Sequence, residues 1–237
     1  CLTEGLSALT RLHYKACEPY HNILDALAFD FGYISTYADI PFLPVRLFKE
    51  LDLLSVPRNE IAKTMTSSGT SGQGVSKIYL DRETSANQTK VLSKIVSSFF
   101  GGKRMPMLIL DSQSVVKDRT KFSARGAGIL GFSIFANDKA YAFDDNMEID
   151  REVIEGFLKK HKGRNIFLFG FTFMIWQHFY KELLKQGLKY DLSCGILLHG
   201  GGWKKLANEA ISSSDFRKLL HEACGITRVR NYYGMVE

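Results

Sequence analysis

A run of hydroxyl and glycine residues closed by a lysine is the strongest chemical signal in this 237-residue chain. From Thr66 to Lys77 it reads Thr-Ser-Ser-Gly-Thr-Ser-Gly-Gln-Gly-Val-Ser-Lys, and strand-like segments flank it. Glycines let backbone amides turn toward an anion, hydroxyl groups donate further hydrogen bonds, and lysine adds a positive charge. The run therefore predicts a phosphate-binding loop, and hence a nucleotide site.

The sequence of this loop does not match two common phosphate-binding motifs. Gly69 and Gly74 have the spacing of the P-loop, but Val75 stands where that motif needs lysine. The dinucleotide fingerprint would need a third glycine where Lys77 stands. A flexible Ser/Gly linker is the remaining alternative. Lys77 and the apolar residues directly after it argue against a linker.

The loop resembles that of the adenylate-forming superfamily, the ligases that make acyl-AMP, although Ser76 replaces a frequent proline. The partner motifs of that superfamily follow in the expected order. A glycine run, Gly200-Gly201-Gly202, comes directly after a predicted strand. The chain then ends in Tyr233-Gly234-Met235-Val236-Glu237, which is similar to a Tyr-Gly-x-Thr-Glu element with valine in place of threonine.

Four segments together look more specifically like the acyl-protein synthetase family, whose best-known members supply fatty acid to the reductase of bacterial luminescence. They are 40–49, the loop with 78–81, 122–125 and 199–205. The resemblance implies that ATP activates a long-chain fatty acid as acyl-AMP, with release of pyrophosphate. The acyl group would then pass to a protein cysteine thiol and on to an acyl reductase or acyltransferase partner. An acyl-CoA ligase and a non-catalytic acyl- or nucleotide-binding module stay open as alternatives.

The resemblance also assigns roles to residues. The β- and γ-phosphates of ATP would contact Thr66, Ser67, Ser68, Gly69, Thr70, Ser71 and Gly72, with Lys77 nearby. Catalytic roles would fall to Lys77, Thr70 and Glu237, and Glu237 would coordinate Mg²⁺. The rest of the nucleotide site would be formed by Gly200, Gly201, Gly202, Tyr233 and Gly234, with Tyr233 on the adenine face.

Aromatic residues near a strand-to-helix junction are the candidates for the acyl pocket. The resemblance suggests Phe169, Phe171 and Phe173, with His199 and Trp203 flanking the glycine run. Aromatics at this spacing can equally belong to the core, and the length of the acyl chain cannot be read from them.

Alternating strand and helix patterns predict an α/β fold with a largely parallel sheet. We expect a helical N-terminal section over 1–60 and an α/β nucleotide- and acyl-binding part over 61–237, resembling an incomplete N-terminal domain of adenylate-forming ligases. The predicted strands are 61–65, 77–80, 107–110, 132–136, 165–169, 196–199 and 227–231. The predicted helices are 7–29, 82–99, 150–160, 172–185 and 214–223. We expect a longer protein, whose ribose-binding aspartate, second-domain lysine and acyl-carrying cysteine follow Glu237.

Composition excludes several other functions. The net charge of +6 comes from scattered basic clusters without aromatic interleaving, which argues against nucleic acid and suits ATP. The six histidines lack the paired spacing of a helical zinc site. The four cysteines are too sparse for a disulfide framework, so most should be reduced and buried. No apolar run is long enough for a membrane span, and we expect a cytoplasmic protein.

Two further segments partly match known binding motifs but lack a required feature of each. The glycines of 126–131 have dinucleotide spacing but lack the required strand and helix around them. The acidic run 144–148 suggests calcium, but Ile149 occupies the place of the obligatory glycine. We expect a turn there, with Asp150 capping the next helix.

Overall fold

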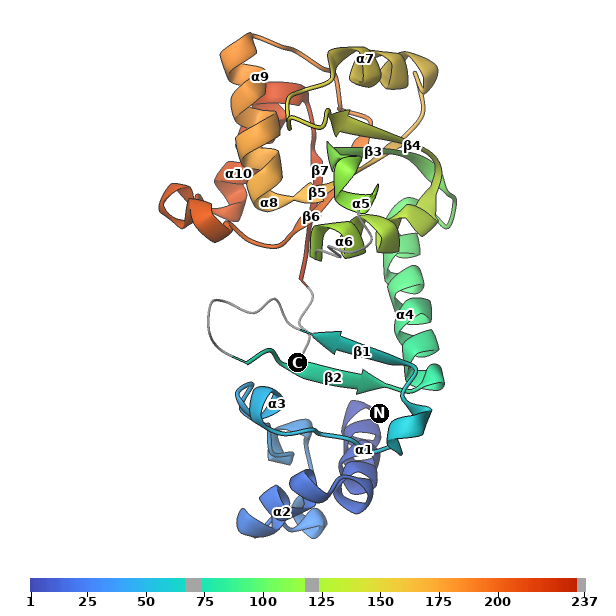
Figure 1. Ribbon diagram of the computed structural model, residues 1–237, viewed down its shortest axis with the longest axis vertical. Helices are drawn as coiled ribbons and strands as arrows, with labels where there is room; N and C mark the ends of the chain where they lie inside the picture. The colour runs from blue at the N-terminus through green and yellow to red at the C-terminus, as the bar shows by residue number, and fades with distance from the viewer. Residues whose placement is uncertain (67–73, 118–123, 234–237) are drawn as a thin grey trace. The chain divides into compact units, whose positions relative to one another are not determined.

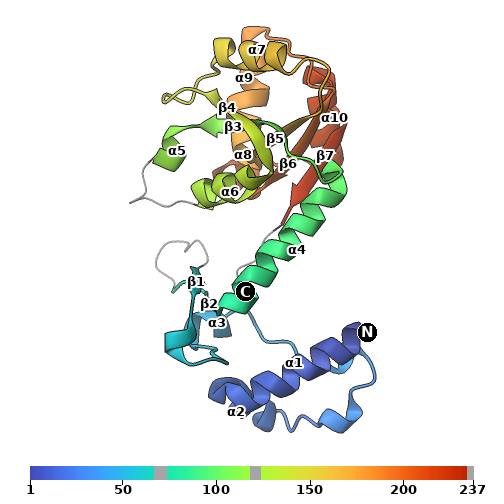
Figure 2. The same ribbon diagram turned by 90° about the vertical axis from the view of Figure 1, so that its right-hand side faces the viewer.

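The computed structural model describes residues 1–66, 74–117 and 124–233 of the protein (Figure 1). The chain forms two compact units, the first from Cys1–Val96 and the second from Ser97–Tyr233. Helix α4 (Arg82–Phe100), seen along its length in Figure 2, begins in the first unit and ends in the second. The predicted division at residue 60 stays a prediction.

The first unit confirms the predicted helical opening. Its helices are α1 (Leu2–Ala16), α2 (Glu18–Ala26) and the short α3 (Leu47–Glu50), with 3₁₀ turns η1 (Phe31–Tyr33), η2 (Tyr37–Asp39) and η3 (Arg58–Glu60). Pro19 stands in the first turn of α2, where a missing N–H leaves no hydrogen bond unmade. The apolar core of this unit is small, with Cys17, Leu24, Leu80 and Val96 buried.

Two short strands in the first unit flank the predicted phosphate loop. Strand β1 (Lys63–Thr66) pairs antiparallel with β2 (Lys77–Leu80). The register places Thr66 opposite Lys77 and Lys63 opposite Leu80. The two ends of the loop therefore lie next to each other on one ladder.

The second unit contains the predicted parallel sheet. Its strands are β3 (Met105–Ser112), β4 (Ala136–Phe143), β5 (Ile166–Phe171), β6 (Gly195–Gly200) and β7 (Arg228–Tyr232), in the order β4-β3-β5-β6-β7 with every neighbour parallel. The three central strands are buried along nearly all of their length. Helices cover both faces of such a sheet, which explains the continuous apolar runs of its central strands.

The two faces of this sheet have different covers. On one face, Leu108, Leu168 and Leu197 join a large core cluster with residues of α7 (Arg151–Lys160), of the helix starting at Thr172, and of α10 (Ser213–Cys224). On the other, the rings of Phe100 and Phe132 lie 4.6 Å from Phe167 and 4.8 Å from Phe169 respectively. Phe132 ends helix α6 (Ala124–Phe132), which follows α5 (Ser114–Lys117).

One predicted strand is wrong, and one predicted helix is irregular. Residues 132–136 are not a strand, because α6 reaches Phe132, the 3₁₀ turn η4 (Ser133–Phe135) follows, and β4 begins only at Ala136. Packing of Phe132 on the sheet outweighs the strand preference of this aromatic stretch. The predicted helix 172–185 is present as α8 (Thr172–Met174), a π-helical segment η5 (Ile175–Tyr180) and α9 (Lys181–Gln186).

Candidate functional site

The carboxyl ends of the five parallel strands form one edge of the sheet in the second unit. The strand order reverses between β3 and β5, since β4 lies on one side of β3 and β5, β6 and β7 lie on the other. Open parallel sheets bind ligands outside the strand ends at such a reversal. The strands end here in Asp111-Ser112, Phe171 and Gly200, so these residues and their contacts make up the candidate site.

The glycine run after β6 is a tightly packed turn. A Cβ on Gly200 would lie 2.5 Å from the carbonyl oxygen of Tyr232, and one on Gly201 would lie 2.3 Å from Cδ1 of Phe171. Gly201 and Gly202 have φ angles of +79° and +60°, which favour glycine. A Cβ on Gly202 would meet no atom of the described residues within 4 Å. The protein's own packing therefore requires glycine at 200 and 201, whereas no described residue crowds Gly202.

A buried hydrogen bond between His199 and Thr172 fixes the start of this turn. The Oγ1 atom of Thr172 lies 2.9 Å from Nδ1 of His199 and donates to the carbonyl oxygen of Gly200 at 3.0 Å. Because a hydroxyl group has one proton, Nδ1 of His199 must then be the donor to Thr172. Burial lowers the pKa of His199 to about 4, so its ring is neutral near pH 7. His199 therefore positions the turn as a neutral group.

The predicted acyl-pocket residues lie in different surroundings. Phe169 is buried among aromatic rings, whereas Phe171 is half-buried and lies against the glycine turn. The ring centroids of Phe171 and Phe173 are 6.5 Å apart. Trp203 packs edge-on against Trp176, with centroids 5.3 Å apart. Of the three phenylalanines, Phe171 is thus the one that the structure brings to Gly201.

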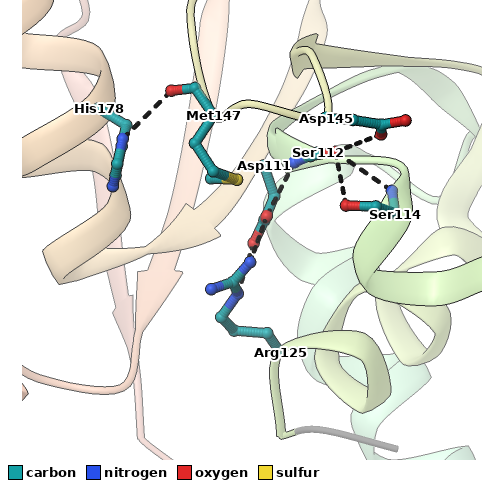
Figure 3. Close-up of polar contacts among 7 residues, drawn as sticks. All are labelled: Asp111, Ser112, Ser114, Arg125, Asp145, Met147 and His178. Carbon is teal, nitrogen blue, oxygen red and sulfur yellow. Dashed lines mark hydrogen bonds and ion pairs between the residues drawn. The ribbon is translucent and has the colours of Figure 1, made fainter. Parts of the chain in front are cut away.

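An ion pair at the end of β3 was not predicted from the sequence (Figure 3). The side chain of Asp111 is only 1% exposed and accepts from Nε of Arg125 at 3.0 Å and from Nη2 at 2.8 Å. It also accepts from the backbone N–H of Ser112 at 2.8 Å. Burial raises the pKa of Asp111, although Arg125 beside it acts in the opposite direction. The available signal was an aspartate directly after the apolar run 107–110 of this strand.

The neighbouring polar residues hold the loop after β4. The hydroxyl of Ser112 donates to Asp145 at 3.1 Å and lies 2.9 Å from the hydroxyl of Ser114. The Nδ1 atom of His178 lies 3.2 Å from the carbonyl oxygen of Met147 (Figure 3). These contacts order the strand ends around the ion pair.

The described flanks of the phosphate loop are in the first unit. The Nζ atom of Lys77 lies 3.9 Å from Asp52, which also accepts from Tyr79 and Arg58 at 2.6 Å each. The hydrogen bond from Tyr79 is the largest of the causes that lower the pKa of Asp52. Asp52 is therefore a carboxylate that holds Lys77 loosely, and Lys77 remains 47% exposed.

Several predicted site residues lie outside the described part of the chain: Ser67, Ser68, Gly69, Thr70, Ser71, Gly72, Gly234 and Glu237. Tyr233 is described and is an exposed residue directly after β7. The roles given to all of these residues remain predictions.

The contacts of the acidic run 144–148 show that it forms a turn. Asp144 accepts from the backbone N–H groups of Asn146 and Glu148, and Asp150 caps α7 by accepting from Val153. This confirms the predicted turn and cap. Among the residues that the structure describes, no three His, Cys, Asp or Glu side chains gather as a metal ion would require.

The structure also shows the surroundings of the glycines in 126–131 and of the cysteines. The glycines of 126–131 lie inside α6, so they do not form the turn that a dinucleotide motif needs. All four cysteines are free, and Cys17 and Cys224 are buried. No helix within the described ranges has both the length and the apolar composition needed to cross a bilayer.

Comparison with known proteins identifies the family. The family model described as "Acyl-protein synthetase, LuxE" matches residues 4–237. The chain is 42% identical over 62 residues to the long-chain-fatty-acid–luciferin-component ligase of Photorhabdus luminescens, a match that covers 26% of this chain and 53% of that protein.

A solved structure shares the fold. The open conformation of 2-hydroxyisobutyryl-CoA ligase in complex with 2-HIB-AMP and CoA matches with a TM-score of 0.63 and 12% identity, over 99% of this chain and 49% of the ligase. The two matches thus span about half the length of each relative. At such low identity, the structural match shows the fold alone. The chain belongs to the acyl-protein synthetase (LuxE) family and has the fold of about half of that CoA ligase chain.

Proposed function

We propose that the protein uses ATP to activate a long-chain fatty acid as acyl-AMP, releases pyrophosphate, and passes the acyl group to a protein cysteine thiol. The observation that carries this proposal is the family match over residues 4–237. The edge of the parallel sheet supports it, because the strand order reverses there and open parallel sheets bind ligands at such a reversal.

The main physical difficulty of this reaction is charge. A carboxylate that attacks the α-phosphate of ATP brings two anions together, so the site must screen the phosphates and align the reactants. We assign the screening to Thr66, Lys77 and the loop 67–72, with Thr70 among its phosphate contacts. Glu237 would hold Mg²⁺, and Tyr233 with Gly234 would contact the adenine.

The second unit would hold the acyl side of the reaction. Gly202 would offer its open backbone to the nucleotide or acyl group, while Gly200 and Gly201 keep the turn in shape. Phe171, which touches that turn, is the best candidate to contact the start of the acyl chain. The thiol acceptor would be a protein cysteine, from which an acyl reductase or acyltransferase partner takes the acyl group.

Fatty-acid-dependent exchange between pyrophosphate and ATP tests the first half-reaction on the full-length protein. We expect exchange with fatty acids and none with the matching fatty alcohols, which cannot form an acyl-adenylate. Labelled acyl groups should then be trapped on the protein itself. Trapping on free coenzyme A would instead indicate an acyl-CoA ligase. Absence of exchange, with no stabilisation by ATP, would refute the enzymatic proposal.

A further inference from the structure

The ion pair between Asp111 and Arg125 lies at the strand-order reversal but has no role in the function proposed above. We propose that Arg125, held in place by Asp111, binds the carboxylate of the fatty acid before it is activated. The inference rests on the proposed function in one respect, namely that a fatty acid is the substrate. It assigns the recognition of the acid's head group to a residue outside the phosphate loop.

The geometry of the pair leaves donors for a ligand. Asp111 takes one proton from Nε and one from Nη2 of Arg125. A guanidinium group has five N–H donors in a fixed plane, so three of them are directed away from Asp111. The side chain of Arg125 is 27% exposed, whereas that of Asp111 is 1% exposed. The buried carboxylate thus orients a partly accessible, planar donor group.

Fold stability alone does not account for such a pair. Removing two charges from water costs about as much as their attraction returns, and apolar residues of similar volume often serve as well. Asp111 directly follows a fully buried apolar segment of β3. An apolar residue there would simply extend the core. A positional role for the guanidinium group explains why charges are present at this strand end.

Aromatic surface lies one helical turn from Arg125. Residues three apart share a helix face, so Gly128 follows Arg125 along α6 on the same side. A Cβ on Gly128 would lie 3.3 Å from the rings of Phe169 and Phe171, and Phe171 also contacts Gly201. A guanidinium group one helical turn away from aromatic rings suits a molecule with a carboxylate head and an apolar tail.

The local charges favour a carboxylate over the phosphates of ATP. Asp111 offsets much of the positive charge of Arg125, so binding depends on planar, paired hydrogen bonds. Asp145, a carboxylate in the loop after β4, is bonded by Ser112 and lies on the far side of Asp111 from Arg125 (Figure 3). The two oxygens of a carboxylate can accept two parallel hydrogen bonds from the planar guanidinium group. The carboxylate of Asp145 is not directed toward that position.

The test compares head groups without ATP, on the full-length protein. Fatty acids from octanoate to hexadecanoate are titrated first, and the tightest binder is then compared with its alcohol. We expect the wild type to prefer the acid, and Arg125→Gln to lose about tenfold or more of that preference. Arg151→Gln is the matched control, since Arg151 is exposed on α7 and bonds Gln186. It should keep the preference.

A double variant separates ligand binding from folding. Asp111→Leu with Arg125→Met replaces both charges by apolar side chains and should fold even where Arg125→Gln does not. We expect this protein to bind the acid and the alcohol about equally. Asp111→Asn should weaken the preference less than Arg125→Gln, because Asp111 acts only by positioning Arg125. Retention of the acid preference by either Arg125 variant would overturn the proposal.

Exchange kinetics separate this proposal from the one it rests on. In a variant that retains exchange, loss of Arg125 should raise the KM for fatty acid and leave the KM for ATP unchanged. A raised KM for ATP alone would place a phosphate at Arg125 and overturn the proposal. If the wild type shows no exchange but prefers acid over alcohol through Arg125, the adenylation proposal fails and the carboxylate site stands.

Discussion

The β1–β2 ribbon and the glycine turn after β6 carry the two best-described parts of the predicted site, and they are built differently. Most of β1 is exposed and β2 is largely half-buried, and the contact between Lys77 and Asp52 is a long one at 3.9 Å between exposed side chains. The turn continues a fully buried strand, and two of its glycines, Gly200 and Gly201, are in close contact with Tyr232 and Phe171 respectively.

This difference separates two ways of placing functional groups. Close packing fixes the backbone of the turn, because the interior tolerates no extra atom there. An exposed ion pair fixes little, since solvent and salt weaken it. Substitutions at the turn should therefore reduce stability, whereas substitution of Lys77 should reduce activity and leave the fold intact.

The largest expected effect is that of Gly201→Ala. Its Cβ would overlap the ring of Phe171, and a non-glycine residue at φ +79° is strained. We expect the free energy of unfolding to fall by about 4 kcal/mol. Urea unfolding followed by tryptophan fluorescence measures this, because Trp176 and Trp203, the two tryptophans of the chain, both lie in the second unit.

Gly163→Ala is the matched control for that change. Gly163 has φ +78° in the same unit, but a Cβ there would meet no atom within 4 Å in the part of the chain that the structure describes. Only the backbone strain of about 1 kcal/mol should appear. Equal losses in the two variants would show that contact with Phe171 does not matter.

The next prediction contrasts a buried ion pair with an exposed one. Asp111→Asn leaves the guanidinium group of Arg125 without its charge partner, so we expect a loss of about 3 kcal/mol in the free energy of unfolding. Asp52→Asn removes a carboxylate that is 39% exposed, and its effect on thermal unfolding followed by circular dichroism should be much smaller. A larger effect for Asp52 would reverse the proposed contrast.

Lys77→Ala tests the comparison between the ribbon and the turn by measuring activity instead of stability. We expect an approximately 100-fold loss in fatty-acid-dependent pyrophosphate exchange, typical of removing one electrostatic contact to a reacting group. The melting temperature should be unchanged, because Lys77 is half exposed and weakly paired. Lys63→Ala alters an exposed lysine at the far end of the same ribbon and should keep full exchange. Similar losses in both variants would remove the specific role of Lys77.

Sequence patterns predicted the helices and strands whose formation depends on local residue patterns. The continuous apolar runs of β3, β5 and β6 and the amphipathic repeats of α7 and α10 gave the correct elements to within about two residues. The β4 strand was missed, because it is an edge strand with alternating burial and the polar start Ala-Asn-Asp-Lys. Its partner in the sheet, rather than its composition, makes it a strand.

The ion pair could not be predicted, because it depends on tertiary structure. Asp111 and Arg125 are fourteen positions apart, and only the path of α5 and α6 brings them together. The glycines were predicted to admit a ligand, but Gly200 and Gly201 are needed for contacts within the protein. A close contact between chain segments leaves the same glycine signal as a bound ligand.

The smallest expected effect concerns pH and the buried His199, which links the glycine turn to Thr172. Its folded-state pKa of about 4 lies below the ordinary value of 6.5, so the unfolded chain binds the proton more readily. This contribution to stability is complete above pH 6.5 and is lost as the pH falls toward 4. Between pH 7 and pH 5 the loss should be about 2 kcal/mol. Asp138, whose pKa is lowered to about 2, changes the pH dependence of stability only below pH 3.8, outside this window.

The stability of His199→Gln, measured by urea unfolding with tryptophan fluorescence, should therefore vary less between pH 7 and pH 5 than that of the wild type. An unchanged pH dependence would mean that the stability of the turn does not depend on a neutral His199.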